Sequence, residues 1–134
     1  MVPKLLIVDD DPDVRKIICN LLKAKYGAPL EASNGEEALA LIEKKRPHLV
    51  LLDVMMPEMN GIDVLRAALE IDPTMIVIML TSGIGIDIAK QCLEIGAKQY
   101  ITKPFEAEDL RMEIERLLVK VEETEDKPPW RIKS

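Results

Sequence analysis

Three aspartates stand directly after apolar segments, where their carboxylates could bind a metal ion or accept a reacting group. Asp9 and Asp10 follow residues 5–8, and Asp53 follows residues 49–52. If these segments are neighbouring strands of one sheet, their carboxyl ends bring the three side chains into one small cleft. Carboxylates at close range repel one another unless some are protonated or a hard divalent cation compensates them. Mg²⁺ usually keeps several of its water ligands, so it can be bound by only a few protein oxygens. We therefore predict a magnesium site here.

Two further polar residues, Thr81 and Lys103, also follow apolar segments. Lys103 would place a fixed positive charge opposite the carboxylates. Thr81 would place a hydroxyl group between the carboxylates and Lys103. This set suits a phosphoryl group, because cations spread its charge while a carboxylate attacks the phosphorus. Asp53 would then become an acyl phosphate.

The elements that must position these residues alternate between strand and helix. Three of the apolar segments are continuous, which is typical of parallel strands buried on both faces. A helical pattern follows each strand, and five such units predict an α/β fold. The expected architecture is a doubly wound, five-stranded parallel sheet of order 2-1-3-4-5 with five helices, a flavodoxin-like arrangement. The predicted strands lie near residues 5–8, 29–33, 49–52, 76–80 and 98–102.

Capping residues and apolar stripes locate the helices. Asp11 is the expected N-cap of the first helix, with Pro12 at the first helical position. The second helix begins with a capping box, formed either by Ser33 with Glu36 or by Asn34 with Glu37. The apolar stripes are Val14, Ile17, Ile18, Leu21 and Leu22; Ile62, Leu65 and Leu69; Ile84, Ile88 and Cys92; and Leu110, Ile114, Leu117 and Leu118.

Length and composition limit the classes of function. A chain of 134 residues forms one domain, which we place at residues 1–121, with a C-terminal tail or linker at 122–134. The net charge of −6 and the scarcity of aromatic residues argue against direct nucleic-acid binding. No apolar run approaches the ~20 residues of a membrane span. Cys19 and Cys92 fall at apolar positions of helical patterns, so we expect reduced thiols and a cytoplasmic location.

Several short motifs occur in one order along the chain. They are Ile7-Val8-Asp9-Asp10-Asp11, the segment from Leu52 to Gly61 with Asp53 and Pro57, Leu80-Thr81-Ser82, Gly96-Ala97 and Lys103-Pro104-Phe105. Over residues 4 to about 120, this set resembles the receiver domain of two-component response regulators. The resemblance implies a signalling module that catalyses its own phosphorylation from the phosphohistidine of a histidine kinase or phosphotransfer protein. Its binding surface would change as a result.

The resemblance also implies a role for each residue near the metal. Asp53 would be the phosphoryl acceptor, and Asp9 and Asp10 the acidic pair that holds Mg²⁺ together with the backbone carbonyl of Met55. In this family, the side chains two residues after the acceptor and two after the Thr flank the water that hydrolyses the acyl phosphate. Here they are Met55 and Gly83. Neither can orient water, so we predict slow self-dephosphorylation.

Other implied roles concern the phosphoryl oxygens and the switch. Thr81 and Lys103 would contact the phosphoryl group, and Thr81 would couple to Tyr100, which could equally be a half-buried packing ring. The peptide bond before Pro104 would be cis. The output surface would be the fourth helix, fifth strand and fifth helix, facing a downstream protein or a missing output domain. The protein would be a monomer or a phosphorylation-dependent dimer.

Several alternative functions use the same residue types. A hydrolase of the haloacid dehalogenase type needs a second aspartate where Met55 stands. A flavodoxin-type carrier needs a phosphate cradle where Asp9, Asp10 and Asp11 place three negative charges. A receiver-like module that acts without phosphorylation and a phosphorelay intermediate both stay open. We interpret the one histidine, His48, as structural or exposed and not as a phosphodonor.

Overall fold

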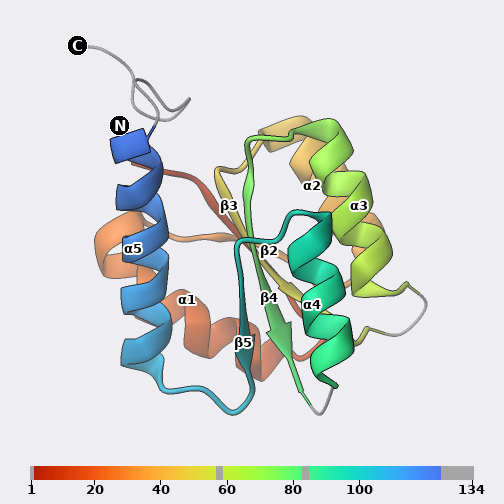
Figure 1. Cartoon of the computed structure of the whole chain (residues 1–134). Coiled ribbons are helices and arrows are strands. Elements are labelled where there is room, and N and C mark those ends of the chain that lie inside the picture. Colours follow the sequence, from red (N-terminus) through yellow and green to blue (C-terminus); the bar gives the residue numbers. More distant parts are fainter. Residues whose placement is uncertain (1, 57–58, 83–84, 125–134) are drawn as a thin grey trace.

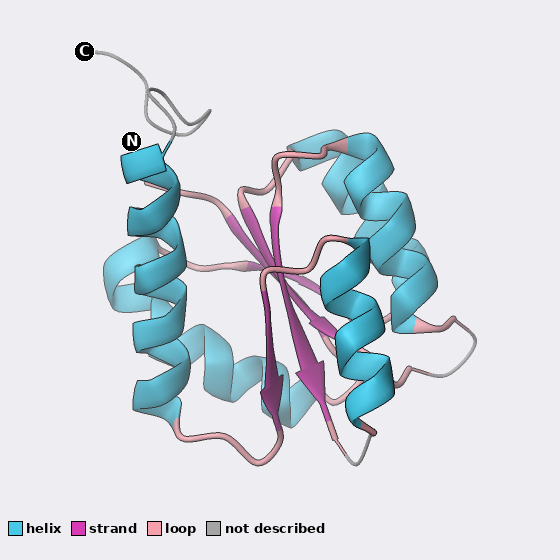
Figure 2. Cartoon of the chain, viewed as in Figure 1, coloured by secondary structure: helices cyan, strands magenta, loops and turns pink. Residues whose placement is uncertain are grey.

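The computed structural model describes residues 2–56, 59–82 and 85–124, which form a parallel sheet with helices on both faces (Figures 1 and 2). The five strands pair in the order β2-β1-β3-β4-β5, which confirms the predicted topology. The strands are β1 (Leu5–Val8), β2 (Leu30–Ala32), β3 (Leu49–Asp53), β4 (Ile76–Thr81) and β5 (Gln99–Thr102). The helices are α1 (Pro12–Tyr26), α2 (Gly35–Lys45), α3 (Gly61–Ile71), α4 (Ile86–Ile95) and α5 (Ala107–Thr124).

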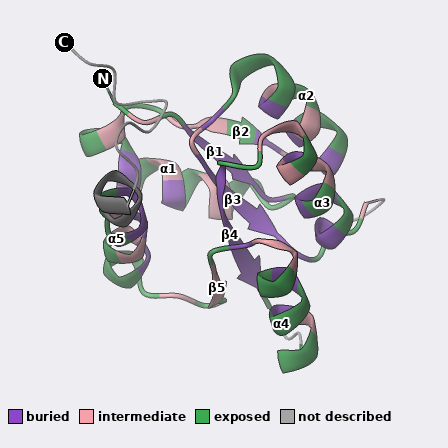
Figure 3. Cartoon of the chain, turned by 45° about the horizontal axis from the view of Figure 1, so that its top comes forward, coloured by how far each residue is buried: buried purple, intermediate pink, exposed green. Residues whose placement is uncertain are grey.

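Two hydrophobic cores lie on opposite faces of the sheet. Because side chains alternate along a strand, Leu5 and Ile7 pack beneath α1 and α5, whereas Leu6 and Val8 pack beneath α2, α3 and α4 (Figure 1). Every residue of β1, β3 and β4 is buried, as the continuous apolar segments predict. Figure 3 shows these strands enclosed between helices whose outer faces are exposed.

The N-terminal ends of α1 and α2 are capped by side chains. Asp11 Oδ1 accepts the Asp13 amide at 2.9 Å, and Pro12 begins α1, as predicted. At α2 the N-cap is Asn34, whose Oδ1 accepts the Glu37 amide at 2.8 Å. Glu37 in turn accepts hydrogen bonds from the amide and hydroxyl of Ser33, both at 2.7 Å. Of the two predicted capping boxes, the one with Asn34 and Glu37 is therefore the closer match.

One apolar residue of the described chain does not lie where its predicted stripe places it. Ile17 is exposed, because at 100° per residue it lies about 120° from the centre of the face formed by Ile18 and Leu22. The fourth stripe was expected to start at Ile84, which lies outside the described residues. Helix α4 begins at Ile86. Ala89 and Cys92 are buried, and Ile88 and Ile95 are partly buried and pack against the core, so the rest of the predicted stripe faces inward.

Helix α5 extends to Thr124, slightly beyond the predicted domain boundary at 121. The remainder of the predicted tail, including Pro128 and Trp130, lies outside the described residues. None of the helices in the described part of the chain is both long and apolar enough to span a membrane.

His48 joins the start of β3 to the start of β1. Its Nδ1 accepts the main-chain N–H of Lys4 at 2.8 Å, while its own amide donates to the Lys4 carbonyl at 2.8 Å. Burial lowers the pKa of His48 below its ordinary value of 6.5, and the charge of Lys4 acts in the same direction. The neutral imidazole is therefore the form that fits the fold.

We expect the stability contributed by His48 to be lost as the pH falls. Because the folded pKa lies below 6.5, the unfolded chain binds the proton more readily, so the free energy of unfolding decreases as the pH drops through this range. Once Nδ1 is protonated it cannot accept a hydrogen bond from the Lys4 N–H, and the loss of this bond lowers the free energy of unfolding by about 1 kcal/mol. Urea unfolding at pH 7.5 and pH 5 measures the change in the free energy of unfolding. His48→Gln, which lacks the imidazole, is the control. Equal pH dependence in both proteins would contradict the assignment.

Candidate functional site

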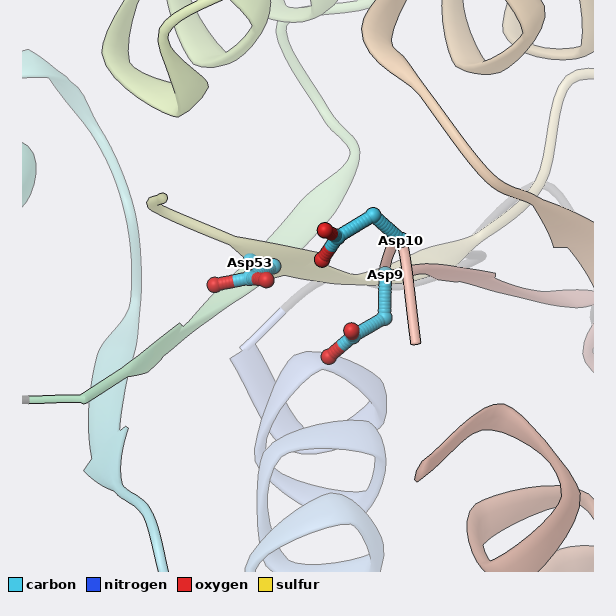
Figure 4. Close-up of side chains that lie close together, drawn as sticks. All are labelled: Asp9, Asp10 and Asp53. Carbon is cyan, nitrogen blue, oxygen red and sulfur yellow. The ribbon is translucent and has the colours of Figure 1, made fainter. Parts of the chain in front are cut away.

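The carboxylates of Asp9, Asp10 and Asp53 lie together at the carboxyl edge of the sheet (Figure 4). Strands β1 and β3 are neighbours, with Val8 paired to Leu52, so the next residue of each chain segment, Asp9 and Asp53, is brought to the same place. Asp53 is the last residue of β3, and Asp9 follows β1. One oxygen from each of the three carboxylates lies within 4.8 Å of the others. Asp9 is 0% exposed and Asp53 is 3% exposed, whereas Asp10 is exposed. The strand order reverses at this point of the sheet, where ligand sites of doubly wound folds lie.

Main-chain contacts hold the acidic side chains in place. The Asp9 amide donates to the Ala32 carbonyl at 3.1 Å, and Asp9 Oδ1 accepts the Asp11 amide at 2.9 Å. Asp53 Oδ1 accepts the Met55 amide at 3.1 Å. Helix α3 starts against this loop at Gly61, where a Cβ would lie only 2.5 Å from the Asp53 carbonyl oxygen. Any side chain at position 61 would therefore displace the loop that carries Asp53.

Lys103 supplies a positive charge to the same cluster. Its Nζ lies 2.7 Å from Asp9 Oδ2 and 3.5 Å from Asp53 Oδ2, and its side chain is 18% exposed. The Lys103 amide donates to the Thr81 carbonyl at 2.6 Å, which ties the loop after β5 to the end of β4. The peptide bond between Lys103 and Pro104 is cis.

The electrostatics of the cluster are those of a site with surplus negative charge. Burial, together with the charge of Asp9, raises the pKa of Asp53 to about 6, although Lys103 and the Met55 amide act in the opposite direction. Burial alone would lower the pKa of Lys103, but the hydrogen bonds and charges of Asp9 and Asp53 outweigh it and raise that pKa. Three carboxylates face one ammonium, and their oxygens are the hard donors that Mg²⁺ prefers. The residues present therefore fit a magnesium ion.

Thr81 and Tyr100 lie on the neighbouring strands β4 and β5. Thr81 is buried, and its hydroxyl donates a long hydrogen bond of 3.4 Å to the Ile101 carbonyl. Tyr100 is partly buried and packs against the core beneath α2, α3 and α4. Of the two residues expected to flank the hydrolytic water, Met55 is exposed next to the cluster, and Gly83 lies outside the described residues.

One residue that the sequence analysis did not single out also contacts the site. Arg15, in the first turns of α1, donates from its guanidinium to the Asp9 carbonyl. A signal for it does exist in the sequence. A cation near the N-terminus of a helix opposes the helix dipole, so Arg15 needs compensating partners elsewhere in the fold.

Comparisons with known proteins identify relatives of this chain. Residues 5–115 match the family described as response regulator receiver domain. The sequence is 34% identical over 115 residues to Sporulation initiation phosphotransferase F of Bacillus subtilis, covering 86% of this chain and 93% of the relative. It is 35% identical over 125 residues to DNA-binding response regulator MtrA of Mycolicibacterium smegmatis, covering 93% of this chain and 53% of that protein.

A solved structure supports the same assignment. The crystal structure of a CheY-like response regulator receiver domain protein from Methanospirillum hungatei is similar to this fold with a TM-score of 0.89 at 30% identity. The match covers 93% of this chain and 100% of that chain. The chain therefore belongs to the receiver domain family of two-component response regulators.

Proposed function

We propose that Asp53 accepts a phosphoryl group from the phosphohistidine of a histidine kinase or phosphotransfer protein. One observation carries the proposal: the buried Asp53 carboxylate lies beside the carboxylate of Asp9 and 3.5 Å from the ammonium of Lys103. A carboxylate held among like charges with one cation opposite it is suited to attack an anionic phosphoryl group, because the cation offsets the repulsion between them.

The chemical step exchanges one bond to phosphorus for another. An oxygen of Asp53 attacks the phosphorus, and the O–P bond forms as the N–P bond of the donor histidine breaks. The imidazole nitrogen leaves with the electron pair of that bond and takes up a proton from water. Lys103 would hold a phosphoryl oxygen, and its bond to Asp9, at 2.7 Å, keeps the ammonium at the site before the donor arrives.

We propose that the acidic cluster binds Mg²⁺ through Asp9, Asp10, Asp53 and the backbone carbonyl of Met55. The support is the convergence of three carboxylates, with oxygens that all lie within 4.8 Å of one another. Burial and, next to it, the charge of Asp9 raise the pKa of Asp53 to about 6, so a cation at this point would favour the ionised carboxylate. When bound, Mg²⁺ would neutralise charge on the carboxylates and on the phosphoryl oxygens. Asp9 is fully buried and must stay close to both Asp10 and Lys103, so it links the metal side of the site to the phosphoryl side.

The same proposal assigns a switch to Thr81 and Tyr100. The 3.4 Å bond from Thr81 to the Ile101 carbonyl is weak, so the hydroxyl can exchange it for a phosphoryl oxygen. Movement of Thr81 would alter the space available to Tyr100 on the adjacent strand. The affected surface would comprise α4, β5 and α5. Between β5 and α5 lies a hollow of about 340 Å³ lined by Gln99, Tyr100, Ile101, Asp109, Leu110 and Glu113.

Two kinds of downstream role are supported by different relatives. The relative named a phosphotransferase is covered over 93% of its length, which favours a phosphorelay intermediate. The relative named a DNA-binding response regulator is covered over 53% of its length, which favours a receiver that controls an additional output domain. Phosphoryl transfer to Asp53 is the step that both roles share.

Incubation with acetyl phosphate tests the proposed function. We expect intact-mass spectrometry to show the gain of one phosphoryl group in the presence of Mg²⁺ and no gain after the metal is removed with EDTA. Phosphorylation at the same rate without a divalent cation, or no phosphorylation under either condition, would contradict the proposal.

The residues expected to flank the hydrolytic water give a second prediction. We expect the double substitution Met55→Asn and Gly83→Glu to shorten the phosphoryl lifetime about tenfold or more, because positioned polar groups orient the attacking water. The loss of the phosphoryl group after removal of the donor measures this lifetime. Met112→Asn is the matched control, since Met112 is 58% exposed on α5 and Met55 is 59% exposed. A lifetime that is unchanged or longer in the double variant would refute the prediction.

A further inference from the structure

Arg15 joins three elements around the acidic cluster. From α1 its Nη1 donates to the main-chain carbonyl of Asp9 at 2.6 Å, and its Nε donates to Glu31 Oε1 on β2 at 3.1 Å. The Arg15 side chain is only 16% exposed, although it carries a charge. Two donors of one rigid guanidinium are therefore directed to two acceptors, the Asp9 carbonyl and the partly exposed Glu31 carboxylate, an arrangement that lysine cannot reproduce.

The Asp9 carbonyl needs a donor because it lies just beyond the end of the sheet. The pairing of β1 with β2 ends at Val8 and Ala32, and the pairing of β1 with β3 ends at Val8 and Leu52. The Asp9 amide is still held by the Ala32 carbonyl, at 3.1 Å. Arg15 holds the carbonyl of the same residue, so the main chain of Asp9 is held on both sides of its Cα.

The orientation of this peptide unit determines where the acidic side chains point. The Asp9 carbonyl belongs to the peptide group that leads directly into Asp10. Rotation of that group would move the Asp10 carboxylate relative to Asp53 and would strain the bond between Asp9 and Lys103. Replacement of residues that orient metal ligands in this way commonly weakens metal binding 10–100-fold.

We propose that Arg15 is a positioning residue for the metal-binding loop, with Glu31 fixing its guanidinium. This inference rests on the proposed function, because the loop is taken to bind Mg²⁺. The alternative is a purely electrostatic role, in which any positive charge at position 15 would reduce repulsion among the carboxylates. Glu31 offsets much of that charge, which favours the role in positioning.

Substitutions at position 15 distinguish geometry from charge. We expect Arg15→Lys and Arg15→Gln both to raise the Kd for Mg²⁺, measured by calorimetry on the full chain, about tenfold. Arg66→Lys and Lys16→Gln are the matched controls, since both residues are exposed on helices, and we expect wild-type affinity from both. We also expect faster amide hydrogen exchange of residues 10–13 in the metal-free Arg15→Lys protein, which does not depend on activity.

Each outcome of these measurements supports or overturns the inference. Wild-type Mg²⁺ affinity in Arg15→Lys together with weak binding in Arg15→Gln would show that charge alone matters, and would overturn the inference. Wild-type affinity in both variants would also overturn the inference. If either variant fails to fold, Glu31→Leu is used in its place, because it removes the carboxylate that holds the Arg15 guanidinium and changes only an exposed residue. Unchanged Mg²⁺ affinity in Glu31→Leu would then overturn the inference. If the wild-type chain itself does not bind Mg²⁺, the proposed function fails together with the role of Arg15.

Discussion

Asp53→Asn is expected to lower the rate of phosphorylation by acetyl phosphate by at least about 10³-fold. The amide keeps the shape of the side chain but lacks the charged oxygen that attacks phosphorus. Asp9 does not replace it, because Asp9 is fully buried and its carboxylate accepts a hydrogen bond from Lys103. Intact-mass measurements over time give the rate. Asp63→Asn, on the exposed side of α3, is the control and should react as the wild type does. A wild-type rate in Asp53→Asn would contradict the assignment.

The same substitution is expected to stabilise the metal-free protein at neutral pH. The pKa of Asp53 is about 6 in the fold against an ordinary value of 3.8, so the ionised group costs up to about 3 kcal/mol above pH 6. This cost decreases as the pH falls from 6 towards 4, because the folded state binds the proton more tightly. Urea unfolding in EDTA at pH 7.5 and 4 therefore should show a stability difference between Asp53→Asn and wild type that disappears at the lower pH. A difference that grows at low pH would contradict this sign.

Lys103→Met is expected to have the second largest effect. It removes the ammonium that lies 2.7 Å from Asp9 and 3.5 Å from Asp53, which leaves these two carboxylates without the ion pairs that Lys103 makes with them. The Lys103 ammonium would stabilise the negative charge that develops on the phosphoryl oxygens. We expect its loss to lower the phosphorylation rate about 10²–10³-fold. Breaking the buried pair also destabilises the fold by about 2–4 kcal/mol, the lower value applying if the carboxyls take up protons.

Rates at saturating Mg²⁺ and urea unfolding measure the two effects of Lys103→Met separately. Lys98→Met is the control, because Lys98 is exposed and precedes the same strand, β5. If both variants react at the wild-type rate, Lys103 does not contact the phosphoryl group. A rate loss in Lys103→Met that persists under conditions where the protein is fully folded supports the proposed contact.

The fold could be predicted from the sequence because its strands are continuous apolar segments. Strands buried on both faces require helices on each side, and alternating strands and helices then restrict the topology to parallel sheets. What could not be predicted is the rotation of individual helices. Ile17 fits an apolar stripe but is exposed, since the orientation of α1 is set by Ile18 and Leu22 against the sheet.

The acidic cluster could be predicted because it depends only on strand ends, which topology brings together. Asp9 and Asp53 follow paired residues of β1 and β3, so their proximity is fixed by register. The contacts of Arg15 could not be predicted in the same way. They join a helix, a loop and a third strand, and their distances depend on how α1 lies on the sheet. The sequence indicates a role for Arg15 only through its unfavourable position, that of a cation in the first turns of a helix.

Identification of the phosphorylated residue is the decisive test of Asp53 as the phosphoryl acceptor. The wild-type chain is incubated with acetyl phosphate and Mg²⁺, the acyl phosphate is reduced with borohydride, and the peptides are sequenced by tandem mass spectrometry. We expect the reduced residue to be Asp53. Modification of Asp9, of Asp10 or of a residue away from the acidic cluster, with Asp53 unmodified, would contradict it.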